Sequence, residues 1–287
     1  MKKRPVVAIM YDFDKTLCNE DMQNYTFIPD LDMTPSEFWG ETSKFGEEEN
    51  MEKILAYMFM MVAKAKEKGI SFTKEYLKSL GKNIKYYKGV TTWFKRINDY
   101  GASLGLDVQH YIISSGVKDI IEGSEIAKEF KAIYACEYMF DKKGDVVWPK
   151  VAINYTMKTQ YVFRISKGID SLNDDDIVNQ KISEKDRRVL YRNMIYLGDG
   201  ITDVPCMRLV KDKNGKSIAV YPRGKKDKVA DLLRYQRVNN IALADYSENS
   251  ELENIVKLQM EYIALLTKIE EKQKKQLQSI KAKGEDE

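Results

Sequence analysis

The chain has 287 residues, of which 43% are hydrophobic and 32% are charged, and its net charge is +3. This length suffices for one large domain or for a core domain with an insert. The balance of 47 basic and 44 acidic residues gives no electrostatic reason to expect nucleic acid as a partner. No apolar run approaches the ~18 residues that cross a bilayer, so no membrane partner is expected.

The cysteine and histidine content argues against several site chemistries. Cys18, Cys136 and Cys206 lie far apart and form neither a metal-binding spacing nor a disulfide framework, which fits a reducing cytoplasm. The apolar stretch near the start stops at Asp12 without a small-residue cleavage site, so export is not expected. His110 is the only histidine, and a surface or strand-edge position is favoured over a catalytic role.

Short apolar runs alternate with helical patterns along most of the chain, which predicts a parallel sheet covered by helices. Several runs lack polar alternation, as expected where helices cover both faces of the sheet. The predicted strands are 6–11, 111–114, 133–136, 194–197, 217–221 and 240–244. The predicted helices between them are 90–100, 117–130, 184–192, 203–210 and 225–236, and Ser183 with Asp186 resembles a capping box for 184–192.

Residues 20–88 break this alternation. They contain no convincing strand but three helical stretches, near 35–48, 51–67 and 73–83, which predicts a helical insert in a core formed by 1–19 and 89–246. The run YMFMM within the second stretch is apolar around most of its circumference. The core of a small helical bundle is favoured for it over a substrate-facing role.

Two further segments have patterns of their own. Residues 137–147 predict a hairpin with a Lys-Gly turn. Residues 247–287 predict a C-terminal helix and a charged tail, with apolar side chains at helical spacing. These are Leu252, Ile255, Tyr262, Leu266 and Ile269. This apolar stripe either packs on the domain or pairs with a second copy of the chain, which would form a homodimer.

Polar residues follow three of the predicted strands at their carboxyl ends, where ligands bind in open α/β sheets. They are Asp12 and Asp14, then Ser114, Ser115 and Gly116, then Asp199 and Asp203. Carboxylates that meet in one buried patch are very costly unless a cation joins them. Oxygen ligands without histidine or thiolate favour Mg²⁺ over zinc or copper.

The residues at these strand ends resemble the motifs of a known family. DFDKT, residues 12–16, resembles the first motif, D-x-D-x-T, of the haloacid dehalogenase superfamily, and GDGITD, residues 198–203, resembles its fourth. IISSG, residues 112–116, and Lys158 resemble the second and third motifs, in the right order. The helical insert is similar to the cap of the phosphoserine phosphatase-like branch. The resemblance implies an α/β fold, with a Rossmann-like parallel sheet core and an inserted helical cap.

The resemblance also implies a Mg²⁺-dependent phosphomonoester hydrolase with assigned residue roles. Asp12 would be the nucleophile that forms an aspartyl-phosphate, and Asp14 would be the general acid and base. Thr16 would brace Asp14 and its loop. Lys158 and the Ser114 hydroxyl would hold phosphoryl oxygens, with Ser115 as an alternative and Gly116 beside them.

The metal ligands follow from the same resemblance. The carboxylates of Asp12 and Asp199 and the backbone carbonyl of Asp14 would hold the Mg²⁺ ion. Asp203 would bind a metal-bound water or orient the lysine of the third motif. Lys150 and Lys167 remain rivals for that lysine.

A helical cap that closes over the site implies a small phosphorylated metabolite as substrate. Phosphoserine is the first candidate by resemblance, with Glu20 or Asp21 as the acid that grips it. However, residues 20–88 contain no arginine to pair with its carboxylate. Lysines such as Lys44, Lys53 or Lys64 could substitute, without the bidentate fork that suits a carboxylate. Aromatic cap residues such as Trp39 and Tyr57 could instead admit a larger or less polar ester. A phosphotransferase with the same intermediate, and a non-catalytic binding protein, are the alternative functions.

Overall fold

A computed structural model describes residues 4–283 and shows one seven-stranded sheet with the strand order β4-β3-β2-β1-β5-β6-β7. The strands are β1 (Val6–Tyr11), β2 (Asp107–Val117), β3 (Phe130–Phe140), β4 (Val146–Val151), β5 (Met194–Gly198), β6 (Lys216–Tyr221) and β7 (Asn240–Leu243). Only β4 runs antiparallel to its neighbour among these strands. The predicted α/β fold with a parallel sheet is confirmed.

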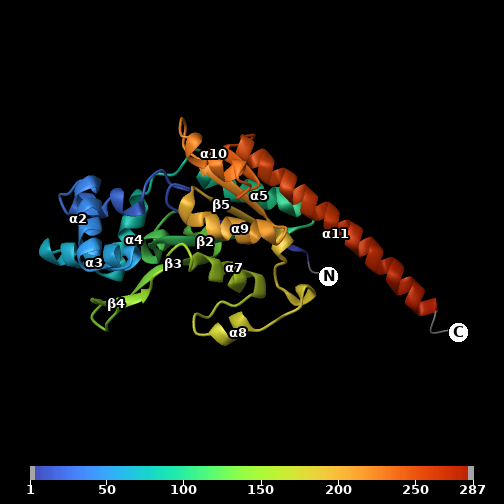
Figure 1. Ribbon diagram of the computed structural model, residues 1–287, viewed down its shortest axis with the longest axis horizontal. Coiled ribbons are helices and arrows are strands. Elements are labelled where there is room, and N and C mark those ends of the chain that lie inside the picture. Colours follow the sequence, from blue (N-terminus) through green and yellow to red (C-terminus); the bar gives the residue numbers. More distant parts are fainter. Residues whose placement is uncertain (1–3, 284–287) are drawn as a thin grey trace.

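Helices cover both faces of the sheet (Figure 1). On one face, α5 (Val90–Ser103) packs against β2 and contacts α11 (Glu251–Lys283). On the other, α7 (Lys158–Lys167) packs against β2 and contacts α9 (Val204–Asp212). α10 (Asp227–Arg234) contacts β6 and β7. The central strand β1 is therefore buried along its whole length, which explains its unbroken apolar run.

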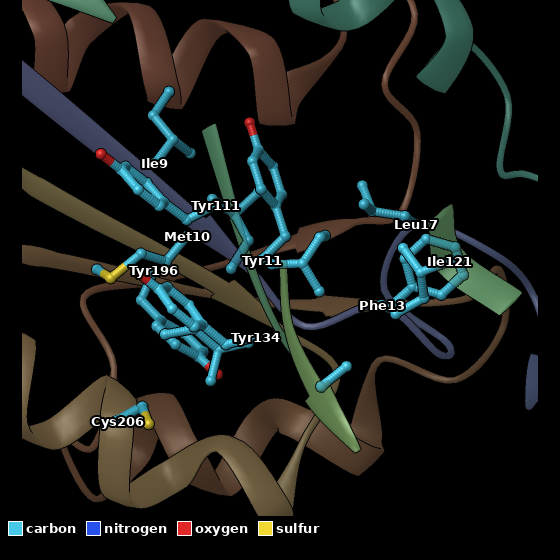
Figure 2. Packing of buried hydrophobic residues seen from close by; sticks show 14 of the residues in the cluster. Ile9, Met10, Tyr11, Phe13, Leu17, Tyr111, Ile121, Tyr134, Tyr196 and Cys206 are labelled. Atoms are coloured by element: carbon cyan, nitrogen blue, oxygen red, sulfur yellow. The ribbon is translucent and has the colours of Figure 1, made fainter. Parts of the chain in front are cut away.

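Tyrosines from neighbouring strands fill much of the core. Figure 2 shows Tyr11 of β1 with Tyr111 of β2, Tyr134 of β3 and Tyr196 of β5, all of them buried. His110 lies in the same core, where its Nδ1 is 3.0 Å from the Tyr11 hydroxyl. The prediction of a surface or strand-edge histidine is wrong, because polar partners inside the core satisfy both ring nitrogens.

The chain between β1 and α5 is helical and lies at one end of the sheet (Figure 1). Its helices are α1 (Phe27–Asp30), α2 (Pro35–Glu48), α3 (Lys53–Glu67) and α4 (Lys74–Leu80), with short 3₁₀ turns at Met22–Asn24 and Gly81–Asn83. Thr34 and Glu37 form a capping box at the start of α2. Met58, Met60 and Met61 of the run YMFMM are buried in the core, whereas Phe59 is half exposed and Tyr57 lines a cavity. The division into core, cap and tail remains a prediction.

The predicted helix 117–130 is wrong beyond its first turns. α6 (Lys118–Glu122) ends at Gly123, and a 3₁₀ turn at Ala127–Glu129 leads into β3. A side chain at Gly123 would collide with the carbonyl oxygen of Lys78 in α4. This close contact between two elements is invisible in the local pattern.

The predicted helix 184–192 is wrong as well. The chain forms two 3₁₀ turns there, Glu184–Asp186 and Tyr191–Asn193. Ser183 donates its hydroxyl to the Asp186 carboxylate instead of capping a helix. Between the turns the chain bends at Arg188 and Val189. There Val189 donates its amide to the Ser166 carbonyl, and Arg188 donates to the Tyr111 hydroxyl. A short helix α8 (Asp175–Asn179) precedes this segment.

The predicted hairpin and C-terminal helix are present. β3 and β4 pair across a turn in which Gly144 has a φ of 87°, a conformation that favours glycine. α11 continues as one helix to Lys283 and projects beyond the rest of the molecule (Figure 1). No helix in residues 4–283 combines the length and the apolar character needed to span a bilayer.

Candidate active site

Three acidic side chains converge where β1 and β5 end. β1 pairs directly with β5, and the Asp12 amide extends this pairing by donating to the Leu197 carbonyl over 2.9 Å. Asp199 and Asp203 follow β5, so that both reach the end of β1. Carboxylate oxygens of Asp12, Asp199 and Asp203 all lie within 4.8 Å of one another.

Lys158 joins two of these carboxylates. Its Nζ lies 2.9 Å from Asp12 Oδ1 and 2.8 Å from Asp203 Oδ1, and its side chain is only 1% exposed. The Tyr196 hydroxyl also donates to Asp203 Oδ1, over 2.8 Å. The rival lysines lie elsewhere, because Lys150 pairs with Glu137 and Lys167 donates to backbone carbonyls beside α8.

Burial and mutual repulsion disfavour the charged forms of these acids. Burial first, and then the charge of Asp203, raise the pKa of Asp12 to about 7, although the Lys158 ammonium opposes the shift. The same two causes raise the pKa of Asp199 to about 6. The Lys158 ammonium does not balance the two buried carboxylates of Asp12 and Asp203 and the half-buried one of Asp199, so a further positive charge would stabilise their ionised forms.

The cluster fits a Mg²⁺ ion. All of its donors are carboxylate oxygens, the ligands that Mg²⁺ prefers. Asp203 Oδ2 is buried and has no hydrogen-bond partner in the part of the chain that the structure describes. Gly198 provides the room for this carboxylate, since any side chain at Gly198 would collide with it.

The Asp14 carboxyl lies apart from this cluster. Its Oδ1 accepts a hydrogen bond from the Met22 amide over 2.9 Å, at the start of the helical segment. Burial raises the pKa of Asp14 well above its usual value, and the nearby Asp21 and Asp12 add to the shift. A proton therefore stays on Asp14 at a pH where an exposed aspartate has lost it, which suits a general acid. The metal cluster of residues 4–283 does not include the Asp14 side chain.

The residues of the second motif and Thr16 occupy different positions. Ser114 is buried near the end of β2, and its Oγ accepts a hydrogen bond from the Gly116 amide over 3.0 Å. A Cβ at Gly116 would lie 3.0 Å from Asp14 Oδ2 and would collide with Met22. The Thr16 hydroxyl is buried without a partner in residues 4–283, so the structure shows no hydrogen bond from it to Asp14.

No family model matches the chain. A protein of Borreliella burgdorferi described only as uncharacterized is 25% identical over 291 residues, covering 92% of this chain and 99% of its own. A HAD family hydrolase from Salmonella enterica serovar Typhi superimposes with a TM-score of 0.55 at 13% identity, over 84% of this chain and 68% of its own. A probable phosphoserine phosphatase from Vibrio cholerae superimposes with a TM-score of 0.54 at 11% identity, over 92% of this chain and 67% of its own. The chain has the haloacid dehalogenase (HAD) fold.

In this HAD fold the four motif-like positions share one cavity, which we call the phosphate cavity. Its volume is about 580 Å³, and Asp12, Ser114, Lys158 and Asp199 all line it. Asp14 and Ser115 lie in its wall as well. The sequence-predicted site residues thus meet around one space, apart from Thr16, Gly116 and Asp203, which do not line it.

The phosphate cavity also has lining residues that the sequence analysis missed. They are Lys15, Asn154, Tyr155 and Thr202, together with Met51, Glu52 and Ile54 around the start of α3. Lys53, one of the lysines considered for a substrate carboxylate, lines the cavity as well. Lys15 lies inside the first motif and has a positive φ of 57°, and its ammonium pairs with Asp21 over 2.6 Å. Between the two predicted acids, Asp21 lines the cavity, whereas Glu20 accepts a hydrogen bond from Asn24.

Proposed function

We propose that this chain is a Mg²⁺-dependent phosphomonoester hydrolase that acts on a small phosphorylated metabolite through an aspartyl-phosphate on Asp12. One observation supports it above all: Lys158 bridges Asp12 and Asp203 in a cluster with Asp199, at the wall of a cavity that Asp14 also lines. A nucleophilic carboxylate, a fixed cation and a protonated acid in one cavity are the groups that phosphoryl transfer requires.

In the first step, a carboxylate oxygen of Asp12 attacks the phosphorus atom while the bond from phosphorus to the leaving oxygen breaks. Asp14 gives its proton to that oxygen, so the product leaves as a neutral alcohol. Lys158 favours the ionised form of Asp12, since its ammonium lowers the pKa that burial raises. The carboxylates of Asp12 and Asp199 and the backbone carbonyl of Asp14 would hold a Mg²⁺ ion, with Asp203 beside them, and the ion would neutralise negative charge on the phosphoryl group.

In the second step, Asp14 takes a proton from a water molecule whose oxygen attacks the same phosphorus atom. The bond between phosphorus and the Asp12 oxygen breaks, inorganic phosphate is released, and the Asp12 carboxylate is restored. Asp14 thereby returns to its protonated form, so the cycle is balanced in protons. An alcohol in place of water would make the protein a phosphotransferase.

Hydrolysis of p-nitrophenyl phosphate in the presence of Mg²⁺ tests the proposal. We expect activity that EDTA suppresses and that Asp12→Asn abolishes, because the amide is a poor nucleophile. Asp145→Asn, at an exposed turn between β3 and β4, is a matched control that should keep full activity. Full turnover by Asp12→Asn would contradict the assignment of the nucleophile.

A further inference from the structure

A second cavity adjoins the phosphate cavity and reaches between the helices α2 and α3; we call it the cap cavity. Its volume is about 430 Å³, and it shares Asp14, Asp21 and Ser115 with the phosphate cavity. Asp14 is the group that protonates the leaving oxygen in the proposed function. The leaving alcohol of a bound ester therefore extends from Asp14 into the cap cavity.

The aromatic walls of the cap cavity are held in place by their own hydrogen bonds. Trp39 donates its indole Nε1–H to Asn24 over 3.0 Å, and Tyr57 donates its hydroxyl to the Ser115 carbonyl over 2.6 Å. Both side chains line the cavity. Because the indole N–H of Trp39 and the hydroxyl of Tyr57 already donate to protein acceptors, these two side chains present mainly apolar ring surface to a ligand.

Two residues that line the cap cavity each have a buried polar atom without a partner in the described part of the chain. The atoms are Gln23 Oε1 and Thr42 Oγ1, on side chains that are 2% and 6% exposed. A buried polar atom without a hydrogen bond costs about 1–3 kcal/mol. A ligand that donates hydrogen bonds to Gln23 and Thr42 would remove this cost, and a purely apolar ligand would not.

The charges around the cap cavity disfavour an anionic leaving group. Asp14, Asp21 and Glu47 line it, whereas Lys53 is the sole cation among its described lining residues. Lys53 and Glu47 are both exposed, and Asp14 and Asp21 are half-buried. The Lys15 ammonium pairs with Asp21. No buried cation in the described lining is therefore free to meet a carboxylate, which would be costly to bury there unpaired.

We infer that the substrate is a phosphomonoester whose leaving alcohol carries a hydroxyl or ammonium donor and no carboxylate. Gln23 and Thr42 accept the hydrogen bonds of that donor, while Trp39 and Tyr57 enclose the carbon skeleton. This inference rests on the proposed function and narrows its substrate class. It predicts that phosphoserine, which carries a carboxylate, is hydrolysed with a lower kcat/KM than esters of similar size that lack a carboxylate.

Phosphoserine and phosphoethanolamine differ only by the carboxylate, so their kcat/KM values test the inference in the unaltered protein. We expect phosphoethanolamine, glycerol phosphate or both to exceed phosphoserine by about tenfold or more. Faster turnover of only one of the two would show whether the amine or the hydroxyl is the donor, and would support the inference. Equal or faster turnover of phosphoserine would overturn it.

Two variants test the roles of the acceptors. Thr42→Val and Gln23→Met keep the side-chain volume but remove the acceptor. Each should lower kcat/KM for the preferred ester about tenfold relative to p-nitrophenyl phosphate, whose leaving group has no such donor. Thr91→Val, at an exposed position of α5, is the matched control and should leave this ratio unchanged. An unchanged ratio in both variants would overturn the inference.

The two proposals fail in different ways. If p-nitrophenyl phosphate is hydrolysed through Asp12 but phosphoserine is preferred, only the substrate inference fails. If none of the esters is hydrolysed with Mg²⁺ present, the proposed function fails and the substrate inference fails with it.

Discussion

The residues of the candidate site illustrate how burial tunes ordinary carboxyl groups. Asp12 and Asp14 are two positions apart, but they have different neighbours. Asp12 touches the Lys158 ammonium, which favours its ionised form, whereas Asp14 accepts a hydrogen bond from a neutral backbone amide. Burial first, and then the charges of Asp21 and Asp12, raise the pKa of Asp14 well above the usual range, although the Met22 amide opposes the shift. One carboxyl is thereby suited to act as a nucleophile and the other as an acid.

Gly198 provides a residue-scale test of the cluster. Gly198→Ala should displace the Asp203 carboxylate, because the added methyl group would collide with it. We expect at least about a tenfold loss of kcat/KM, since a misplaced group near reacting atoms is costly. Gly200→Ala is a matched control in the same loop, where the added methyl group would meet no atom within 4 Å. Equal kcat/KM values for the two variants would show that catalysis does not depend on the position of the Asp203 carboxylate.

His110 makes a pH-dependent contribution to stability. Trp93 donates to the Tyr11 hydroxyl oxygen, which leaves the Tyr11 proton for His110 Nδ1, and His110 Nε2 then donates to Asn98. This network needs the neutral ring, and burial lowers the pKa of His110 from 6.5 to about 3. Between those pH values the unfolded chain binds a proton that the folded protein does not, so the free energy of unfolding falls as the pH falls.

We expect the wild-type protein to lose about 2 kcal/mol more than His110→Gln when the pH is lowered from 7 to 5. Urea unfolding of both proteins at the two pH values measures this difference, and the carboxyl groups that they share cancel. The same pH dependence in both proteins would mean that the ring protonates freely in the folded state.

At the scale of helices and strands, the sequence predicts an element correctly where its local pattern determines the structure, and wrongly where contacts with distant residues do. The strand 6–11 was predicted with the observed bounds, because a central strand buried on both faces is apolar throughout. The helices 117–130 and 184–192 were predicted wrongly. At Gly123 α4 approaches too closely for a side chain, and at Val189 the amide donates to a carbonyl of α7 instead of one within its own helix.

The candidate site divides in the same way. Asp12, Asp14, Asp199 and Asp203 could be identified because acids at the ends of buried strands are conspicuous in a sequence. Gln23 and Thr42 could not, since they line a cavity only when the helical segment is placed against the sheet.

Two tyrosine hydroxyls connect adjacent residues of α3 with the sheet region. Tyr57 donates to the Ser115 carbonyl over 2.6 Å, and Tyr138 of β3 donates to the Met58 carbonyl over 2.9 Å. Tyr57→Phe and Tyr138→Phe should each lower the free energy of unfolding by about 1 kcal/mol. Of these two tyrosines only Tyr57 lines the cap cavity, so of the two variants only Tyr57→Phe should change kcat/KM. Chemical unfolding of both variants measures the loss of stability, and steady-state kinetics measures kcat/KM. A lower kcat/KM in Tyr138→Phe alone would contradict the prediction.

At the scale of the whole molecule, α11 has two apolar faces. Leu252, Val256 and Met260 are buried against the body of the protein. Leu258 and Leu265 lie on the other side of the helix and are 61% and 57% exposed. α11 can therefore pack on the domain and also pair with a second copy of the chain. The buried face packs on the domain, and the exposed face remains available for self-association.

We predict that the protein forms a homodimer through the exposed face, where Leu258, Tyr262, Leu265 and Ile269 repeat at the three- and four-residue spacing of helix pairs. Sedimentation equilibrium should give twice the mass of one chain for the wild type. The double variant Leu258→Lys/Leu265→Lys should give the mass of one chain, because charge at the contact opposes pairing. A monomeric wild type at micromolar concentration would contradict the prediction.

The central claim is that Asp12 becomes phosphorylated during turnover. Its most direct test is to quench the protein in acid during steady turnover of p-nitrophenyl phosphate with Mg²⁺, and then to map modified peptides by mass spectrometry. The claim predicts one base-labile phosphoryl group on the peptide that contains Asp12, and none in Asp12→Asn. Phosphorylation of another residue instead, or turnover without phosphorylated protein at any quench time, would contradict it.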